Sequence, residues 1–402
     1  MSWLKPRRIF LTALSILILA SNIERVMTQN GFPFFVPPQW SHDGSRIAIV
    51  EGTTIVIYDA NSETMLYRLE GHTDTILDVA WSPLDFRLAS ASGDQTVKVW
   101  DSDTRTLLHT LTGHDEPVTQ VIWSPDSRRL ISSGIESETS LFMWNAETGI
   151  IELETNAGTI VEAAFNRNED RVAASYSLWL VLLDGATLQP ITQQPPAMCC
   201  SNRMESLAWS FDGSQIVTGS INGLITVWEA AALTQISQFP ANTFYDQDGY
   251  GIPDLSLSWV RDVAFSVDGI IEAVSGDGTV GRWDTQGNLL EETQIGQLET
   301  ASWSPYGARL AVQSGASSAS ISTESERRAD MDGMLQVVTP FASSERLQFI
   351  AAACGADQLI GQTITDATLS AVIAQLESAT ADQIPPACAA DLIAIAEAIQ
   401  SQ

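Results

Sequence analysis

Short apolar segments recur along this chain at a nearly constant interval, and each ends in an aromatic residue followed by a polar turn. The pattern reads WSHDGSRIAIV from Trp40, WSPDSRRLISS from Trp123 and WSPYGARLAVQ from Trp303. Seven copies begin at Trp40, Trp81, Trp123, Phe165, Trp209, Phe265 and Trp303, with spacings of 41, 42, 42, 44, 56 and 38 residues. An interval near forty residues predicts a repeated structural unit.

Within one repeat, the alternation of apolar and polar positions predicts four short strands. In the second repeat these strands cover residues 76–81, 87–92, 96–101 and 106–111. One such sheet cannot bury both of its faces, whereas seven sheets around an axis bury them against one another. We therefore predict an all-β, seven-bladed β-propeller of four-stranded antiparallel blades over residues 34–341.

Closure of the ring leaves two alternatives. The seventh repeat offers strands near residues 309–312, 318–323 and 334–340, but the middle segment, which would be the third strand of the blade, is small and polar. Alternatively, a strand from residues 25–36 pairs back and completes the last blade.

Two short motifs carry a family resemblance. Gly71-His72 and Gly113-His114 precede the second and third repeats, and a Trp-Asp pair or a near variant closes the third strand, as in Trp100-Asp101. With these motifs the chain resembles the WD-repeat β-propeller family over residues 34–340. The resemblance implies a hydrogen-bonded network within one repeat, matched here by His72, Ser90 or Ser92, Asp94 and Trp100. The third repeat lacks the Asp, and the fourth lacks both Gly-His and Trp.

The N-terminus has the composition of a targeting segment. Lys5, Arg7 and Arg8 precede an apolar run over residues 9–20, which is shorter than the about 20 residues that span a bilayer. We expect residues 1–20 to be a signal peptide or an uncleaved signal anchor, followed by a linker or closing strand over 21–33. The protein is then extracytoplasmic, exported by general secretion or the twin-arginine route, and touches a membrane only through an uncleaved segment.

After Phe341 the pattern becomes helical. Leu369, Val372, Ile373 and Leu376 follow helical spacing, and we predict a three-helix domain over residues 342–402. Cys354 ends the first predicted helix and Cys388 lies in the first turn of the third. In an exported protein these two cysteines are expected to form a disulfide. The domain is either a cap or spacer, or a docking module.

Charge and motif content exclude several functions. The net charge is −29, and nucleic acid binding needs a basic stripe, so we expect no nucleic acid partner. The chain contains four His and none of the motifs GxSxG, HExxH or CxxC. We therefore expect no catalytic residues and no enzyme activity.

Two long loops between blades stand out. The first covers residues 194–203 and offers Met198 and Arg203, with adjacent Cys199 and Cys200 that form a loop disulfide, pair with other thiols or bind a soft metal. The second covers residues 241–254 and offers Phe244, Tyr245 and Tyr250. Long loops on a rigid scaffold commonly carry function, and aromatic and Arg side chains anchor interfaces.

The second loop also contains DQDGYGIPD, which resembles the calcium loops of thrombospondin type 3 repeats. Asp246, Asp248 and Asp254 would supply carboxylates and Tyr250 a backbone carbonyl, because alternating acids on a Gly-bent loop converge on a hard cation. Calcium is the one cofactor that the sequence suggests.

Together these features predict an exported binding or scaffold module. It would contact a protein partner through one propeller face, using Met198, Arg203, Phe244, Tyr245 and Tyr250. The alternatives are an extracytoplasmic propeller enzyme acting on a peptide or sugar, and a membrane-anchored sensor or assembly factor.

Overall fold

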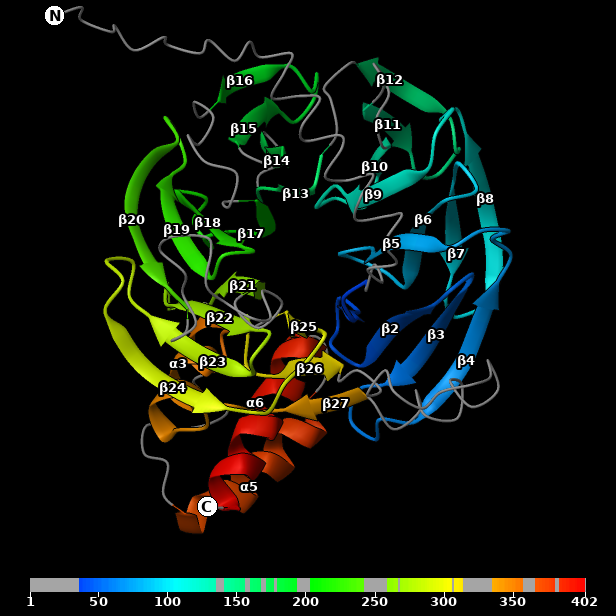
Figure 1. Ribbon diagram of the computed structural model, residues 1–402. Coiled ribbons are helices and arrows are strands. Elements are labelled where there is room, and N and C mark those ends of the chain that lie inside the picture. The colour runs from blue at the N-terminus through cyan, green and yellow to red at the C-terminus, as the bar shows by residue number, and fades with distance from the viewer. Residues whose placement is uncertain are drawn as a thin grey trace, which may run out of the picture. The chain divides into compact units, whose positions relative to one another are not determined.

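A computed structural model describes residues 36–134, 141–155, 160–167, 171–176, 179–193, 203–241, 259–266, 268–305, 307–313, 335–356, 366–379 and 383–401. Residues 36–402 form one compact unit. Its strands build seven antiparallel sheets arranged as blades around a common axis, with three helices beside the last sheets (Figure 1). The predicted seven-bladed propeller is therefore confirmed.

Strand order follows the chain within each blade. The blades are β1–β4 (Gln39–Trp40, Arg46–Glu51, Thr54–Asp59, Met65–Glu70), β5–β8 (Ile76–Trp81, Arg87–Ser92, Thr96–Asp101, Thr106–Thr112), β9–β12 (Val118–Trp123, Arg129–Gly134, Leu141–Asn145, Ile151–Thr155), β13–β16 (Glu162–Phe165, Arg171–Tyr176, Trp179–Asp184, Pro190–Gln193), β17–β20 (Met204–Trp209, Gln215–Ser220, Leu224–Glu229, Thr234–Pro240), β21–β24 (Val260–Phe265, Ile271–Ser275, Thr279–Trp283, Leu289–Gln294) and β25–β27 (Thr300–Trp303, Leu310–Gln313, Leu335–Val338).

Four of the tryptophans that end inner strands join neighbouring blades. The indole nitrogen of Trp81 donates to the carbonyl of Gln39 (2.9 Å), and that of Trp123 donates to Ala80 (2.9 Å). Trp40 does the same across the closure of the ring, donating to the carbonyl of Ser302 at 3.0 Å. The repeated tryptophan thus pairs a polar group of one inner strand with the next blade while its ring fills the space between the sheets.

The seventh blade has three strands within the described residues. β27 pairs with β26, with Leu310 opposite Val338, so residues 335–338 take the third-strand position and not the fourth that was expected. The side chain of Glu63 accepts a hydrogen bond from the backbone N–H of Val337 on the outer edge of β27 (3.0 Å). Residues 318–323 and 25–35, the two predicted ways of completing this blade, lie outside the described residues.

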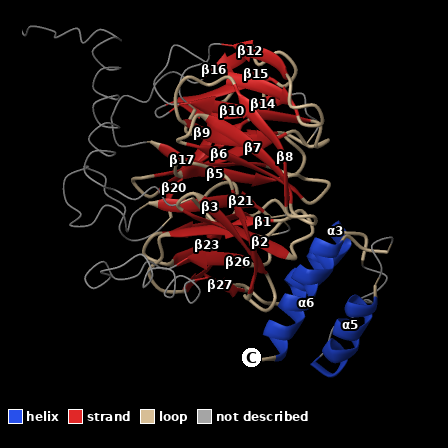
Figure 2. Cartoon of the chain, turned by 90° about the vertical axis from the view of Figure 1, so that its right-hand side faces the viewer, coloured by secondary structure: helices blue, strands red, loops and turns tan. Residues whose placement is uncertain are grey.

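Antiparallel order gives the propeller two distinct faces. One face carries the turns between second and third strands and the loops between blades. We name it the Gly-His face, because Gly71-His72 lies there. The opposite end, with the turns between first and second and between third and fourth strands, is the tail face. Figure 2 shows the helices on the side of the tail face.

The helical tail comprises α3 (Ser344–Ala353), α5 (Asp366–Ser378) and α6 (Pro386–Gln400). Ser343 caps α3 by accepting the N–H of Arg346, and Leu347, Leu369, Leu376 and Leu392 belong to a shared buried core. A disulfide between Cys354 and Cys388 links the end of α3 to α6. None of the described helices is long and apolar enough to cross a membrane.

Candidate partner-binding face

A four-residue hydrogen-bond network organises the Gly-His face of the second blade. Trp100 donates its indole N–H to the Ser90 hydroxyl (2.9 Å), which lies 2.8 Å from His72 Nε2. His72 Nδ1 lies 2.8 Å from an Asp94 oxygen. Burial lowers the pKa of His72 in spite of the Asp94 charge. A neutral imidazole therefore donates from Nδ1 to Asp94 and accepts the Ser90 proton at Nε2. Ser92, the alternative to Ser90, instead donates to backbone carbonyls of residues 74 and 75.

Asp94 fixes the turn that carries it. Burial opposes its ionisation, but hydrogen bonds from Thr96, from the N–H of Thr73 and from His72 prevail and lower its pKa to about 2. The carboxylate therefore ties the turn between β6 and β7 to the loop that precedes β5.

The third blade retains only part of this network. Trp144 donates to Ser132 and Ser132 contacts His114 Nε2, both at 2.8 Å. The turn that follows, residues 135–140, contains no Asp and lies outside the described residues. Burial lowers the pKa of His114 to about 4, so it is neutral at physiological pH. Both histidines are thus structural polar groups inside their blades.

Carboxyl side chains from several inner strands gather near the axis. Asp78 on β5 and Asp262 on β21 stand three residues before the aromatic that ends each strand, as does Glu162 on β13. Asp78 accepts the backbone N–H of Val121 in the next blade (2.8 Å), and Asp262 accepts that of Trp303 (3.1 Å). These two acids therefore hold adjacent inner strands together.

The same acids interact electrostatically across the axis. Burial raises the pKa of Asp78 and of Asp262 to about 7, against the hydrogen bonds that favour their charged forms. Burial also raises the pKa of Glu162 well above its ordinary value, and the charges of Asp78, Asp262 and Glu205 raise it further. A cation placed among these carboxyls would favour their charged forms, so the axis favours a cationic side chain.

Of the predicted partner residues, only Arg203 lies within the described part of the chain. Its Nε lies 2.5 Å from Glu205 Oε1, and its carbonyl accepts the N–H of Ile221. The loop thus returns to β17 next to the acids of the axis. Met198, Cys199, Cys200, Phe244, Tyr245, Asp246, Asp248, Tyr250 and Asp254 all lie outside the described residues.

The described residues were compared with the side-chain groupings that bind metals or catalyse reactions. No three His, Cys, Asp or Glu side chains there come together as metal ligands. Asp78 and Asp262, whose pKa values burial raises to about 7, already accept backbone N–H groups of the next blade.

The inner-strand acids were not singled out from the sequence. Their signal is a position, the third residue before the strand-ending aromatic. In six of the seven repeats it is polar: Asp78, Gln120, Glu162, Ser206, Asp262 and Thr300. Gln120 donates to Asp78 (3.2 Å). A polar residue repeated at one position of an inner strand identifies the surface of the axis.

Comparison with known families agrees with this geometry. The model of the WD domain, G-beta repeat, matches residues 63–101, 105–145 and 199–229. These matches end at Asp101, Asn145 and Glu229, each directly after the tryptophan of a third strand. WD-repeat propellers are typically non-catalytic scaffolds for protein–protein interaction.

Similar individual proteins are matched over short lengths. The chain is 36% identical over 55 residues to the intraflagellar transport protein 122 homologs of Xenopus tropicalis and of Homo sapiens, which is 14% of this chain and 5% and 4% of those proteins. The chain thus matches only about a twentieth of their length. A chain in a crystal structure of the mitotic checkpoint complex shares the fold with a TM-score of 0.58 at 15% identity, covering 70% of this chain and 84% of that one. The repeats, the network in the second blade and the seven sheets together establish that this chain belongs to the WD-repeat β-propellers.

Proposed function

We propose that this chain is an exported scaffold that holds a protein partner on its Gly-His face. The observation that carries the proposal is the gathering of Asp78, Glu162, Glu205 and Asp262 near the axis, whose charges raise the pKa of Glu162. A partner segment bearing Lys or Arg would relieve this repulsion. Electrostatic complementarity of this kind increases the rate and specificity of association.

The arrangement of the tail supports the same face. The helices contact blades 6 and 7 at the tail face and are linked to blade 1 through Arg309. The opposite face therefore has more free surface for a large partner. Both long inter-blade loops connect a fourth strand to the next first strand, and such connections belong to the Gly-His face. The export signal predicted from the sequence of residues 1–20 supports an extracytoplasmic partner.

The test combines affinity capture with two sets of variants. Shortening residues 194–202 and 242–258 to tight turns should leave the fold intact and abolish capture of the partner from an envelope extract. Glu162→Gln with Glu205→Gln should weaken capture several-fold, since neither side chain could then ionise when a cationic partner approaches. Leu84→Ser, at a residue that is 64% exposed on the tail face, is the matched control and should bind normally.

Two results would reject the proposal. One is full capture by the loop-shortened protein with an unchanged circular dichroism spectrum. The other is loss of capture on Leu84→Ser alone, which would move the site to the tail face.

A further inference from the structure

The turn between the first and second strands has a common design in four blades. A serine after the aromatic donates to an aspartate two residues later: Ser41 to Asp43 (2.7 Å), Ser124 to Asp126 (2.6 Å), Ser210 to Asp212 (2.7 Å) and Ser266 to Asp268. In three of these turns the aspartate also accepts a backbone N–H two residues further on, as Ser45 donates to Asp43 at 3.1 Å. The carboxylate thus closes the turn.

The seventh blade lacks this aspartate. Its turn reads Ser304-Pro305-Tyr306-Gly307, with tyrosine at the position that holds Asp43 in the first blade. Ser304 nevertheless donates to a carboxylate at 2.7 Å, and that carboxylate belongs to Asp391 on α6, 87 residues away. The N–H of Ala308 points to the same oxygen at 3.4 Å. Asp391 therefore supplies from the tail the group that the other turns carry themselves.

The same carboxylate connects the tail to the first blade through one arginine. Arg309 Nε donates to the other oxygen of Asp391 (2.7 Å). Its two remaining nitrogens donate to Asn61 Oδ1 (3.1 Å) and to the carbonyl of Gly44 (2.8 Å), both in turns of the first blade. Arg309 is 2% exposed and Asp391 is 0% exposed, so the pair has little access to competing water. One buried ion pair thus joins α6, blade 7 and blade 1.

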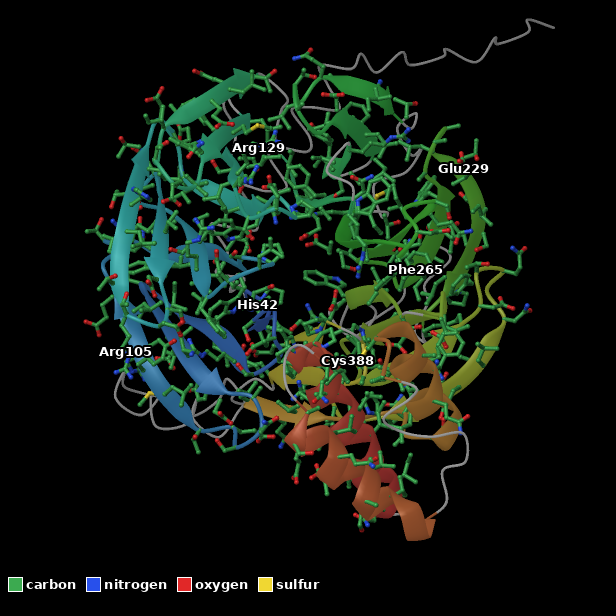
Figure 3. All side chains as sticks on the ribbon, turned by 180° about the vertical axis from the view of Figure 1, so that it is seen from behind. His42, Arg105, Arg129, Glu229, Phe265 and Cys388 are labelled. Carbon is green, nitrogen blue, oxygen red and sulfur yellow. A yellow bond between two sulfur atoms is a disulfide. The ribbon has the colours of Figure 1, made fainter. Side chains whose placement is uncertain are left out.

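A second buried contact extends the attachment to blade 6. Arg346 on α3 lies 2.7 Å from Glu272 of β22 and donates to the carbonyl of Gly307 (2.6 Å). Ala308 of the seventh blade is itself part of the hydrophobic core of the tail. Figure 3 views the tail face and places Cys388 of α6 beside the ring, whereas Arg105 and Glu229 lie at its rim.

We propose that the helical tail is a clasp that closes the propeller. Asp391 completes the turn of the seventh blade, where the sequence has Tyr306 at the position of the aspartate that four other turns carry. The clasp bridges blades 6, 7 and 1, where the described residues give the seventh blade three strands. The order of the seventh blade then depends on the tail through this one carboxylate.

The test is a double-mutant cycle in the full chain, read by hydrogen exchange resolved to segments. Asp391→Ala leaves Arg309 buried without a counter-charge, so amides of β25–β27 and of α6 should exchange faster by about two orders of magnitude or more. Tyr306→Asp alone places a second carboxylate next to Asp391 and should loosen the tail. Glu397→Gln, on the exposed side of α6, is the matched control and should exchange at the wild-type rate.

The combined variant distinguishes the clasp from an ordinary docking contact. Asp391→Ala with Tyr306→Asp should restore protection of β25–β27, because the turn regains a local carboxylate, while the tail stays unprotected. If Asp391→Ala fails to fold, Asp391→Asn should show the same order of effects more weakly. In Asp391→Ala, fast exchange of the tail with wild-type protection of β25–β27 would show that the tail does not support the blade. Failure of the combined variant to regain protection of β25–β27 would refute the role of the carboxylate in the turn.

Discussion

The Ser90 hydroxyl is the junction of the network in the second blade, since it accepts from Trp100 and contacts His72. We expect Ser90→Ala to lower the free energy of unfolding by about 1–3 kcal/mol, because two buried polar groups lose their partner. Ser132→Ala in the third blade is the matched comparison, as that junction has no aspartate. Urea unfolding measures both, and a loss below about 0.5 kcal/mol for Ser90→Ala would contradict the expectation.

Asp262 should make stability depend on pH. Its pKa rises from 3.8 to about 7 on folding, so between these values the folded protein binds more protons than the unfolded chain. The free energy of unfolding therefore falls as pH rises from about 4, and the loss is complete above about 7. Asp262→Asn cannot ionise and should flatten this dependence while keeping an acceptor for the N–H of Trp303.

Thermal unfolding between about pH 5 and about pH 8 measures the effect. Asp212→Asn is the control, because hydrogen bonds from the N–H of Ser214 and from the Ser210 hydroxyl lower the pKa of Asp212 and move its titration out of this range. A wild-type slope in Asp262→Asn would show that another group is responsible.

Sequence reasoning at this scale identified residues whose partners are near in sequence. His72, Ser90, Asp94 and Trp100 lie within one repeat, and a local motif marks them. Asp391 and Arg309 escaped attention because their contact joins segments 82 residues apart, and a single Asp in a helix carries no local signal. Tyr306 in place of an aspartate was the available clue.

Among the elements, the loop over residues 242–258 retains a sequence prediction. If Asp246, Asp248 and Asp254 bind calcium, millimolar calcium should raise the melting temperature, since a ligand specific for the native state stabilises it. Asp248→Asn should remove that shift, and Asp212→Asn should not. Identical melting curves with calcium and with EDTA would exclude the site.

The tail makes a second prediction for an element. Free-thiol titration of the folded protein should find Cys354 and Cys388 unreactive, as their disulfide requires. Cys354→Ser with Cys388→Ser should destabilise the tail by about 4 kcal/mol on the loop-entropy model. Mass mapping that finds both residues as free thiols in exported protein would disprove the bridge.

The pattern predicted strong elements and misassigned a weak one. Strands such as β7 alternate cleanly between apolar and polar positions, and the structure has them where expected, over residues 96–101. The third strand of the seventh blade was predicted at residues 318–323, but the strand that pairs with β26 is β27, residues 335–338. Strand propensity depends on the side chains of the neighbouring strand, so the sequence of a single segment does not determine which of two candidate segments pairs with β26.

For the whole molecule, the distribution of charge leads to a kinetic prediction. A net charge of −29 and acids near the axis should speed association with a basic partner and make it sensitive to salt. Raising ionic strength from about 0.05 M to about 0.5 M should slow association at least tenfold and change dissociation little. An association rate independent of salt would mean that the partner is bound by apolar contacts.

The clasp also has a consequence for biosynthesis. Gly44 and Arg309 meet across 265 residues, and Asp391 follows later still. At about 5–20 residues per second, roughly 20–70 seconds separate the emergence of the first blade from that of its last support. During this interval the flank of the first blade, with Ile49 and Val56 that are buried in the finished ring, is exposed to solvent and to other nascent chains. A ribosome-bound or membrane-associated chaperone that recognises aliphatic strands would therefore determine the yield of this protein more than the stability of the finished ring does.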